Sequence, residues 1–183
     1  QNSYDNYFRH AISKLSNIHF VSTEVYKKRL IKMGESPKSV FNVGSMSLEN
    51  TKEIDLYQKK EIEKKLKIRF LNKIILFTLH PETLNPKALK KQIQISFNSL
   101  NDIKDTTVII TSPNHDIGSS EIISMIKKIC KKKHNYYFFH SLGRKMFFSC
   151  IKFANLIVGN SSSGIIEAPL FKKYSINLGD RQK

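Results

Sequence analysis

The residues with the clearest chemical potential lie between Leu156 and Glu167, in the run Leu-Ile-Val-Gly-Asn-Ser-Ser-Ser-Gly-Ile-Ile-Glu. The apolar start of this run is typical of the end of a buried strand, and its apolar end has the spacing of a helix. Small residues between them let a ligand approach the main chain closely, and free N–H groups at a helix start favour an anion. Ser161, Ser162 and Ser163 add hydroxyl donors. The run predicts a phosphate cradle, with an ordinary serine-capped turn as the alternative.

Other polar loops also follow apolar runs that predict strands. Two of these runs, residues 73–79 and 106–111, are apolar enough for buried parallel strands. Ligands of such sheets bind in loops beyond the carboxyl ends of the strands, so we expect these loops to gather at one edge. They are residues 80–83 with His80, 112–116 with Asn114, 140–143 with Leu142, 160–164, and 179–181 with Arg181.

Strand and helix patterns alternate along the chain, which predicts an α/β fold with a doubly wound, mostly parallel, Rossmann-like sheet. We expect one α/β domain over residues 1–183. The expected helices are 5–15, 24–33, 51–66, 86–100, 120–132, 144–153 and 164–171, and the expected strands are 18–22, 40–43, 73–79, 106–111, 136–139, 155–158 and 174–178.

The chain is strongly basic, with a net charge of +16 over 183 residues. Such a charge favours a polyanionic partner. Its lysines are nevertheless spread along the sequence, and the densest group, residues 127–133, falls at an expected helix end, where cations offset the dipole. No aromatic-plus-arginine pattern of a nucleic-acid module is visible, so we do not expect nucleic acid as a partner. A basic polyanion-binding module stays as an alternative function.

Several classes of protein are not expected from this sequence. No apolar run approaches the ~18 residues that span a bilayer, and residues 1–9 contain no apolar signal-peptide core. The two cysteines, Cys130 and Cys150, belong to no cluster of metal-ligand spacing. We therefore expect no membrane association, no metal, no cofactor and a reducing, cytoplasmic location.

Several motifs together resemble the hydrolysing UDP-N-acetylglucosamine 2-epimerases, in the right order and across nearly the whole chain. This resemblance implies the glycosyltransferase-B architecture, in which two lobes enclose the substrate. By this resemblance we expect residues 1–183 to be the second, nucleotide-binding lobe, with residues 1–17 as an entering helix and with the N-terminal lobe absent. The motifs are residues 9–16 (Arg-His-Ala-Ile-Ser-Lys-Leu-Ser), 20–24 (Phe-Val-Ser-Thr-Glu), 79–83 (Leu-His-Pro-Glu-Thr), 159–164 with Glu167, and 177–182 (Asn-Leu-Gly-Asp-Arg-Gln).

The resemblance implies an enzyme that eliminates UDP from UDP-N-acetylglucosamine through a glycal-like intermediate and then adds water. The products are N-acetylmannosamine and UDP, and the first serves sialic-acid synthesis. A non-hydrolysing sister group usually carries His-Arg-Arg-Glu where this chain has residues 80–83 (His-Pro-Glu-Thr), which favours the hydrolysing branch. Three alternatives stay open: the non-hydrolysing epimerase, a hydrolysing relative acting on a diacetamido-trideoxy UDP sugar in legionaminic-acid synthesis, and a glycosyltransferase-B lobe that transfers from a nucleotide donor.

The resemblance also assigns a nucleotide site. Ser161 and Ser162 match positions that bind the UDP phosphates, and Glu167 matches a glutamate that accepts the ribose hydroxyls. Arg181 matches an arginine near the phosphates, where a planar guanidinium suits phosphate geometry. Two further matches are Asn114, which contacts the nucleotide, and Leu142, which touches the uracil through its main chain.

Catalytic roles are implied for His80, Asp5 and Arg9. At His80 a cationic imidazole would stabilise charge on the departing UDP. Asp5 and Arg9 are four residues apart on one face of the entering helix, where the family places an acid and an arginine in the cleft, and the alternative is a surface ion pair. The carboxylates that move the proton at C2 belong to the other lobe, so we expect this chain alone to be inactive, and the full enzyme to be a homo-oligomer.

Overall fold

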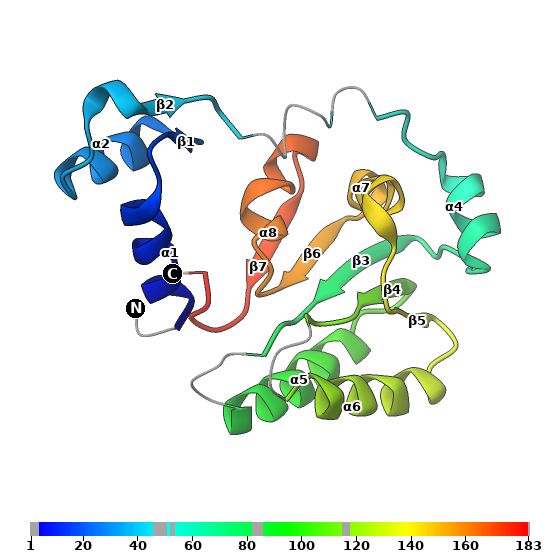
Figure 1. Ribbon diagram of the computed structural model, residues 1–183. Coiled ribbons are helices and arrows are strands. Elements are labelled where there is room, and N and C mark those ends of the chain that lie inside the picture. The colour runs from blue at the N-terminus through cyan, green and yellow to red at the C-terminus, as the bar shows by residue number, and fades with distance from the viewer. Residues whose placement is uncertain (1–3, 46–50, 52–53, 82–85, 115–117, 183) are drawn as a thin grey trace. The chain divides into compact units, whose positions relative to one another are not determined.

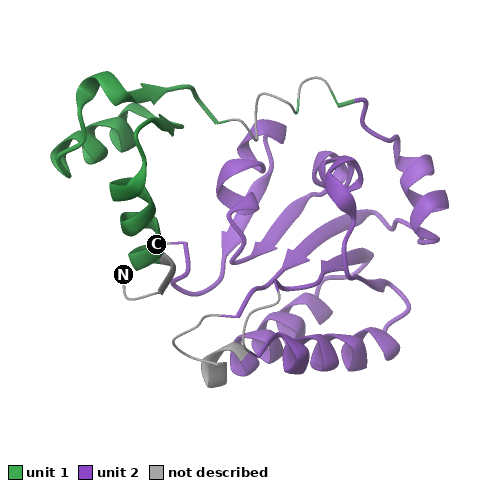
Figure 2. Ribbon diagram, viewed as in Figure 1, with its two compact units in different colours: residues 1–54 green, residues 55–183 purple. Residues whose placement is uncertain are grey.

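The computed structural model describes residues 4–45, 51, 54–81, 86–114 and 118–182. Contacts divide the chain into two compact units, residues 1–54 and residues 55–183 (Figure 2). The sequence predicts one domain with an entering helix over residues 1–17, whereas the first unit extends well past that helix. Its two strands pair with each other and do not join the larger sheet of the second unit.

Unit 1 is built around two short parallel strands, β1 and β2, and two helices. Helix α2 begins after Thr23, whose side chain caps it by accepting a hydrogen bond from the Tyr26 N–H at 3.3 Å. The elements are α1 (Tyr4–Leu15), β1 (His19–Val21), α2 (Glu24–Lys32), the 3₁₀ turn η1 (Pro37–Ser39) and β2 (Val40–Asn42).

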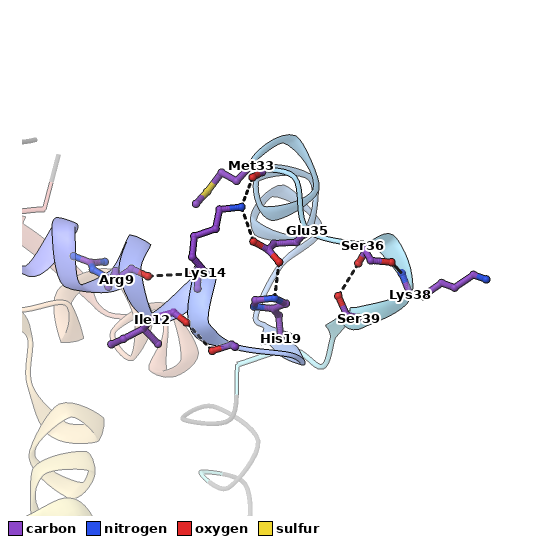
Figure 3. A network of polar contacts seen from close by, with 11 residues as sticks. Arg9, Ile12, Lys14, His19, Met33, Glu35, Ser36, Lys38 and Ser39 are labelled. Atoms are coloured by element: carbon purple, nitrogen blue, oxygen red, sulfur yellow. Dashed lines mark hydrogen bonds and ion pairs between the residues drawn. The ribbon is translucent and has the colours of Figure 1, made fainter.

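A charged network ties the elements of unit 1 together (Figure 3). The Glu35 carboxylate accepts from Lys14 Nζ at 2.7 Å and lies 3.3 Å from His19 Nε2, and His19 is only 7% exposed. Lys14 also donates to the Met33 carbonyl, just beyond the end of α2. The hydrogen bond from Lys14 is the main reason why the pKa of Glu35 is lowered. The network therefore joins α1, β1 and the end of α2.

Unit 2 is a five-stranded, entirely parallel sheet in the order β5-β4-β3-β6-β7. Helices α5 and α6 cover one face, and α7 and α8 cover the other (Figure 1). This arrangement confirms the predicted doubly wound α/β fold. The strands are β3 (Lys73–Thr78), β4 (Thr106–Thr111), β5 (Tyr136–Phe139), β6 (Leu156–Gly159) and β7 (Tyr174–Asn177); the helices are α4 (Lys59–Leu66), α5 (Pro86–Asn101), α6 (Ser119–Lys131), α7 (Gly143–Phe153), α8 (Ser163–Ile166) and the 3₁₀ turn η2 (Pro169–Phe171).

The central strands β3 and β4 are buried on both faces, which explains their continuous apolar runs. Phe77 of β3 packs against Phe97 of α5 with ring centroids 5.0 Å apart, and Phe97 packs in turn against Tyr136 of β5. This core fixes the height at which each strand ends, and so it positions the loops that follow.

Two expected helices are wrong in extent. The helix predicted over residues 51–66 begins only at Lys59, where Gln58 and Glu61 form a capping box, and residues 54–58 are irregular. The helix predicted over 164–171 divides into α8 and η2, because Pro169 has no N–H to continue the α-helical hydrogen bonds. The sequence periodicity covered both segments but did not reveal where hydrogen bonding starts or stops.

The amino ends of β3 and β6 are held together by an asparagine. Asn155 comes directly before β6, and its Oδ1 accepts from the Ile74 N–H at 2.8 Å. The Asn155 N–H donates to the Ile74 carbonyl, also at 2.8 Å. A side-chain amide therefore extends the ladder between these strands at the end of the sheet opposite to the polar loops.

Candidate functional site

The site lies where the chain reverses its direction of travel across the sheet. The strands run outward from β3 through β4 to β5, and the chain then returns to the other side of β3 with β6 and β7. Open α/β sheets bind ligands at such a switch point, beyond the carboxyl ends of the strands. His80 follows β3 and Asn160 follows β6, so both residues lie at this point.

Asn160 clamps the main chain of His80 from both sides. The His80 N–H donates to Asn160 Oδ1 at 2.7 Å, and Asn160 Nδ2 donates to the His80 carbonyl at 2.9 Å. Asn160 is fully buried and His80 is 7% exposed. Because each amide atom has its own partner, the orientation of the Asn160 side chain is fixed.

The imidazole of His80 receives a third contact from the loop after β4. The main-chain N–H of Asn114 donates to His80 Nδ1 at 3.1 Å. A main-chain amide can only donate, so this geometry presents Nδ1 to the Asn114 N–H as an acceptor. Asn114, expected to contact a nucleotide, is exposed and also accepts from Ser119 Oγ through its carbonyl.

The small residues of the loop after β6 have different functions. Gly159 has φ +149°, and a Cβ there would lie 1.7 Å from the Thr78 carbonyl oxygen, so only glycine lets β3 and β6 come this close. Ser161 Oγ accepts from the Ser163 N–H at 3.3 Å, as in the serine-capped turn that was the alternative reading. Ser162 is exposed at the N-cap of α8, without a side-chain capping bond. Ser162 therefore keeps its hydroxyl for other partners.

Glu167 comes directly after α8 and is half-buried. One oxygen of its carboxyl group, Oε2, is enclosed and has no hydrogen-bond partner among the described residues. Burial raises the pKa of Glu167, and a main-chain hydrogen bond and the charge of Arg144 oppose that rise. An enclosed acceptor of this kind is suited to a hydroxyl donor from a bound molecule.

Arg181 and Gln182 bring the last described loop onto the same site. Arg181 Nη1 donates to the Asn160 carbonyl at 3.1 Å, and Gln182 Nε2 donates to the same oxygen at 3.2 Å. Arg181 is an exposed residue, and its guanidinium has further donors for an anion. Asn160 therefore connects His80 on one side with Arg181 on the other.

The remaining predicted residues lie on other elements. Leu142 lies at the same sheet edge, beyond β5, as the N-cap residue of α7. Asp5 and Arg9 belong to α1 in unit 1, where Arg9 is exposed and its carbonyl accepts from Ser13 Oγ. Residues 82–83 of the His80 loop lie outside the described residues.

Sequence reasoning missed Asn160 as a site residue. It was included only as one of several small polar residues in a cradle, although it provides the contacts that join His80 and Arg181. A signal was present, because an asparagine directly after a strand-terminal glycine is well placed to continue a ladder with its side chain. The charged network around Glu35 was also missed, because its members come from three separate elements.

These groups together suit a ligand with an anionic part and hydroxyl groups. Ser162 and Arg181 offer donors to an anion, and Glu167 offers an enclosed acceptor. Within the described part of the chain, no group of three His, Cys, Asp or Glu side chains is placed to hold a metal ion. None of the described helices is long and apolar enough to cross a membrane.

A family model described as UDP-N-acetylglucosamine 2-epimerase matches residues 1–183. A GDP/UDP-N,N'-diacetylbacillosamine 2-epimerase (hydrolyzing) from Campylobacter jejuni is 42% identical over 180 residues, which are 98% of this chain and 47% of the relative. Polysialic acid biosynthesis protein P7 from Escherichia coli is 39% identical over 182 residues, or 99% of this chain and 46% of the relative. The chain thus spans about half the length of the curated relatives it matches.

Solved structures with the same fold include two with nucleotides. UDP-GlcNAc 2-epimerase from Neisseria meningitidis, bound to UDP-GlcNAc, has a TM-score of 0.76 at 21% identity, covering 97% of this chain and 50% of that one. The S. aureus MnaA-UDP co-structure has a TM-score of 0.74 at 20% identity, covering 94% of this chain and 46% of that one. At this identity the likeness concerns the fold.

Proposed function

The chain belongs to the UDP-N-acetylglucosamine 2-epimerase family, and from this premise we propose that it is the UDP-binding lobe of a hydrolysing UDP-sugar 2-epimerase. The proposed full enzyme converts UDP-N-acetylglucosamine and water into N-acetylmannosamine and UDP for sialic-acid-type sugar synthesis. The observation that carries the proposal is the cluster at the switch point between β3 and β6. There Asn160 joins His80 to Arg181, and the enclosed Glu167 oxygen lies one short helix further along the chain.

Each residue of the cluster has a distinct part in holding the nucleotide. Ser161, Ser162 and Arg181 bind the diphosphate, because hydroxyl and guanidinium groups donate to phosphate oxygens. Glu167 accepts hydrogen bonds from the ribose hydroxyls, which supplies a partner for its enclosed Oε2. Asn114 and Leu142 border the nucleotide from the neighbouring strands.

In the proposed reaction, the bond between C1 of the sugar and the diphosphate oxygen breaks while C2 loses its proton. The resulting double bond then adds water at C1, and C2 regains a proton from the opposite face. His80 stabilises the departing diphosphate by donating a hydrogen bond. Asp5 and Arg9 of unit 1 take binding or acid–base roles at the sugar, together with carboxylates from the part of the enzyme that this chain does not include.

A thermal-shift titration tests the nucleotide site. UDP should raise the melting temperature of the chain more than a polyphosphate of equal charge, because a ligand that binds the native state stabilises it. Ser162→Ala and Glu167→Ala should each reduce the UDP shift. Lys90→Ala, which removes a surface ion pair with Glu121, is a matched control that should leave the shift unchanged. Equal stabilisation by any polyanion, with no loss in the site variants, would instead support the basic polyanion-binding alternative.

A second candidate substrate is a diacetamido UDP sugar. Two relatives at 42% and 34% identity carry names with N,N'-diacetylbacillosamine, which favours this alternative over a glycosyltransferase. The two sugars share the UDP part, so the site on this chain serves either one. Product analysis with the full-length enzyme on both UDP sugars decides between them, and the release of N-acetylmannosamine by the 183-residue chain alone would contradict the predicted dependence on the other lobe.

We propose a homo-oligomeric full-length enzyme in the cytoplasm. The free thiols of Cys130 and Cys150 fit a reducing compartment, and burial raises their pKa values to about 11 and about 12, so neither is a reactive thiolate.

A further inference from the structure

We propose that Asn160 is a positioning residue for His80, and that the Asn114 main chain holds the His80 ring as the neutral tautomer with its proton on Nε2. The inference rests on the proposed function in one respect, because the oxygen that accepts the hydrogen bond from His80 Nε2–H belongs to the UDP diphosphate. It goes beyond that function by assigning the protonation state of the ring and the residue that places it.

The contacts of Asn160 require an asparagine. Its Oδ1 accepts the His80 N–H, and its Nδ2 donates to the His80 carbonyl, so one side chain satisfies both main-chain groups of the histidine. Aspartate would set a second oxygen against that carbonyl in a fully buried place, and alanine would leave both groups unsatisfied. The amide continues the β3–β6 ladder by one residue, which fixes the direction in which His80 leaves the sheet.

The second contact selects the tautomer. The Asn114 N–H has no acceptor lone pair, so at 3.1 Å it makes a hydrogen bond only with an unprotonated Nδ1. The proton of the neutral ring is then on Nε2. His80 therefore acts as a neutral donor, whereas Arg181 provides the positive charge.

Asn160 also sets the spacing between these two groups. Its side chain holds His80, while its own carbonyl accepts from Arg181 Nη1 at 3.1 Å. A neutral donor and a cation are thus placed from one buried residue. A change at Asn160 should move both groups relative to the diphosphate, even though Asn160 donates nothing to the ligand itself.

Nitrogen NMR of the chain labelled with ¹⁵N-histidine tests the tautomer without any ligand. The chain has six histidines, and His80→Gln identifies the His80 signals by their loss. We expect an unprotonated Nδ1 and a protonated Nε2 for His80 at neutral pH. A protonated Nδ1, or a rapid average of both tautomers, would overturn the assignment.

Asn160→Ala and Asn155→Ala form a matched pair for the positioning role. Both variants remove an asparagine clamp between β3 and β6, but at opposite ends of the strands. Asn160→Ala should let the His80 ring exchange rapidly between its two neutral tautomers, and it should weaken UDP binding about tenfold or more. Asn155→Ala should lower the melting temperature but leave the His80 tautomer and the affinity for UDP unchanged. Equal changes in the His80 tautomer and in UDP affinity in the two variants would show that Asn160 has only a structural role.

The two proposals fail in different ways. A fixed Nε2–H tautomer in a chain that does not bind UDP would contradict the proposed function and support the inference about the ring. UDP binding to a chain with averaged tautomers would contradict the inference alone. If Asn160→Ala does not fold, two measurements on the wild type still test the inference: the His80 tautomer and the exchange rate of the His80 main-chain amide proton. We expect slow exchange, and exchange at the rate of an unprotected amide would exclude the hydrogen bond to Asn160.

Discussion

Two buried histidines, His80 in unit 2 and His19 in unit 1, are held by different kinds of partner. Both are 7% exposed. His19 lies 3.3 Å from the Glu35 carboxylate, which also accepts from Lys14, so this side-chain partner belongs to an ion pair (Figure 3). The described contacts of His80 come instead from an amide side chain and a main-chain N–H.

The difference shows how each unit uses charge. In unit 1 the charges are paired with one another and join α1, β1 and the end of α2. At the switch point of unit 2, the Asn160 amide and the Asn114 N–H hold His80, and Arg181 and Glu167 keep atoms that a ligand can engage. A structural network neutralises its own charges, whereas a binding site needs charge that is held in place but not fully paired.

Gly159→Ala should have the largest effect on stability and on UDP binding, because it separates β3 and β6, the strands that Asn160 connects. The new Cβ would lie 1.7 Å from the Thr78 carbonyl oxygen, so β6 must move away from β3. We expect a loss of about 3 kcal/mol or more in the free energy of unfolding, measured by urea denaturation. UDP binding should disappear with it.

Gly118→Ala is the matched control for this change. Gly118 also has a positive φ, +90°, but an added Cβ there meets no atom of the described residues within 4 Å. Its cost should be about 1 kcal/mol from backbone strain alone. Similar losses in both variants would show that strain, and not the close approach of β3 and β6, explains the glycine.

Glu167→Gln should separate ligand binding from stability. Removing the carboxylate should weaken UDP binding about tenfold, or about 1.4 kcal/mol, measured by calorimetry. The free chain should become slightly more stable at pH 7. Burial raises the pKa of Glu167 in the folded state above its unfolded-state value. The ionised carboxylate of the wild type therefore destabilises the fold, and this loss of stability develops as the pH rises from the unfolded-state pKa through the raised folded-state pKa.

The pH dependence provides the check on that interpretation. Below the ordinary value of 4.5, Glu167 is protonated in both the folded and unfolded states, so the difference in melting temperature between variant and wild type should vanish. A variant that is less stable than the wild type at pH 7 would indicate that the carboxylate already has a stabilising partner.

Glu35→Gln should have the smallest effect, and it should be confined to unit 1. The pKa of Glu35 is lowered mainly by Lys14, so its contribution is complete above pH 4.5 and is lost as the pH falls through the lowered value. Hydrogen exchange near the end of α2 should be faster in the variant at pH 7, with UDP binding unchanged.

A double variant with Lys14→Met measures the coupling in this network. The two single changes should add to more than the double change, since both remove the same ion pair. Strict additivity would mean that the contact between Lys14 and Glu35 contributes nothing to the stability of unit 1.

The sheet of unit 2 was predictable because β3 and β4 are continuous apolar runs between polar loops, and their hydrophobicity allows only buried strands. The edge of the sheet that carries the site followed from the same pattern. The contacts of Asn160 were not predictable, because they depend on the register between β3 and β6, and residues 80 and 160 are far apart in sequence. The boundary between the units was also hidden, since β1 and β2 have the same local pattern as strands of the main sheet.

The clamp between His80 and Asn160 also bears on the order in which unit 2 folds. The two residues are separated by 80 positions, and β4 and β5 are added on one side of β3 before the chain returns to form β6. Closing so long a loop costs entropy that only the completed β3–β6 pairing recovers. The site is therefore a late product of folding, and a growing chain on the ribosome carries His80 without its clamp until Asn160, in the last third of unit 2, has been made.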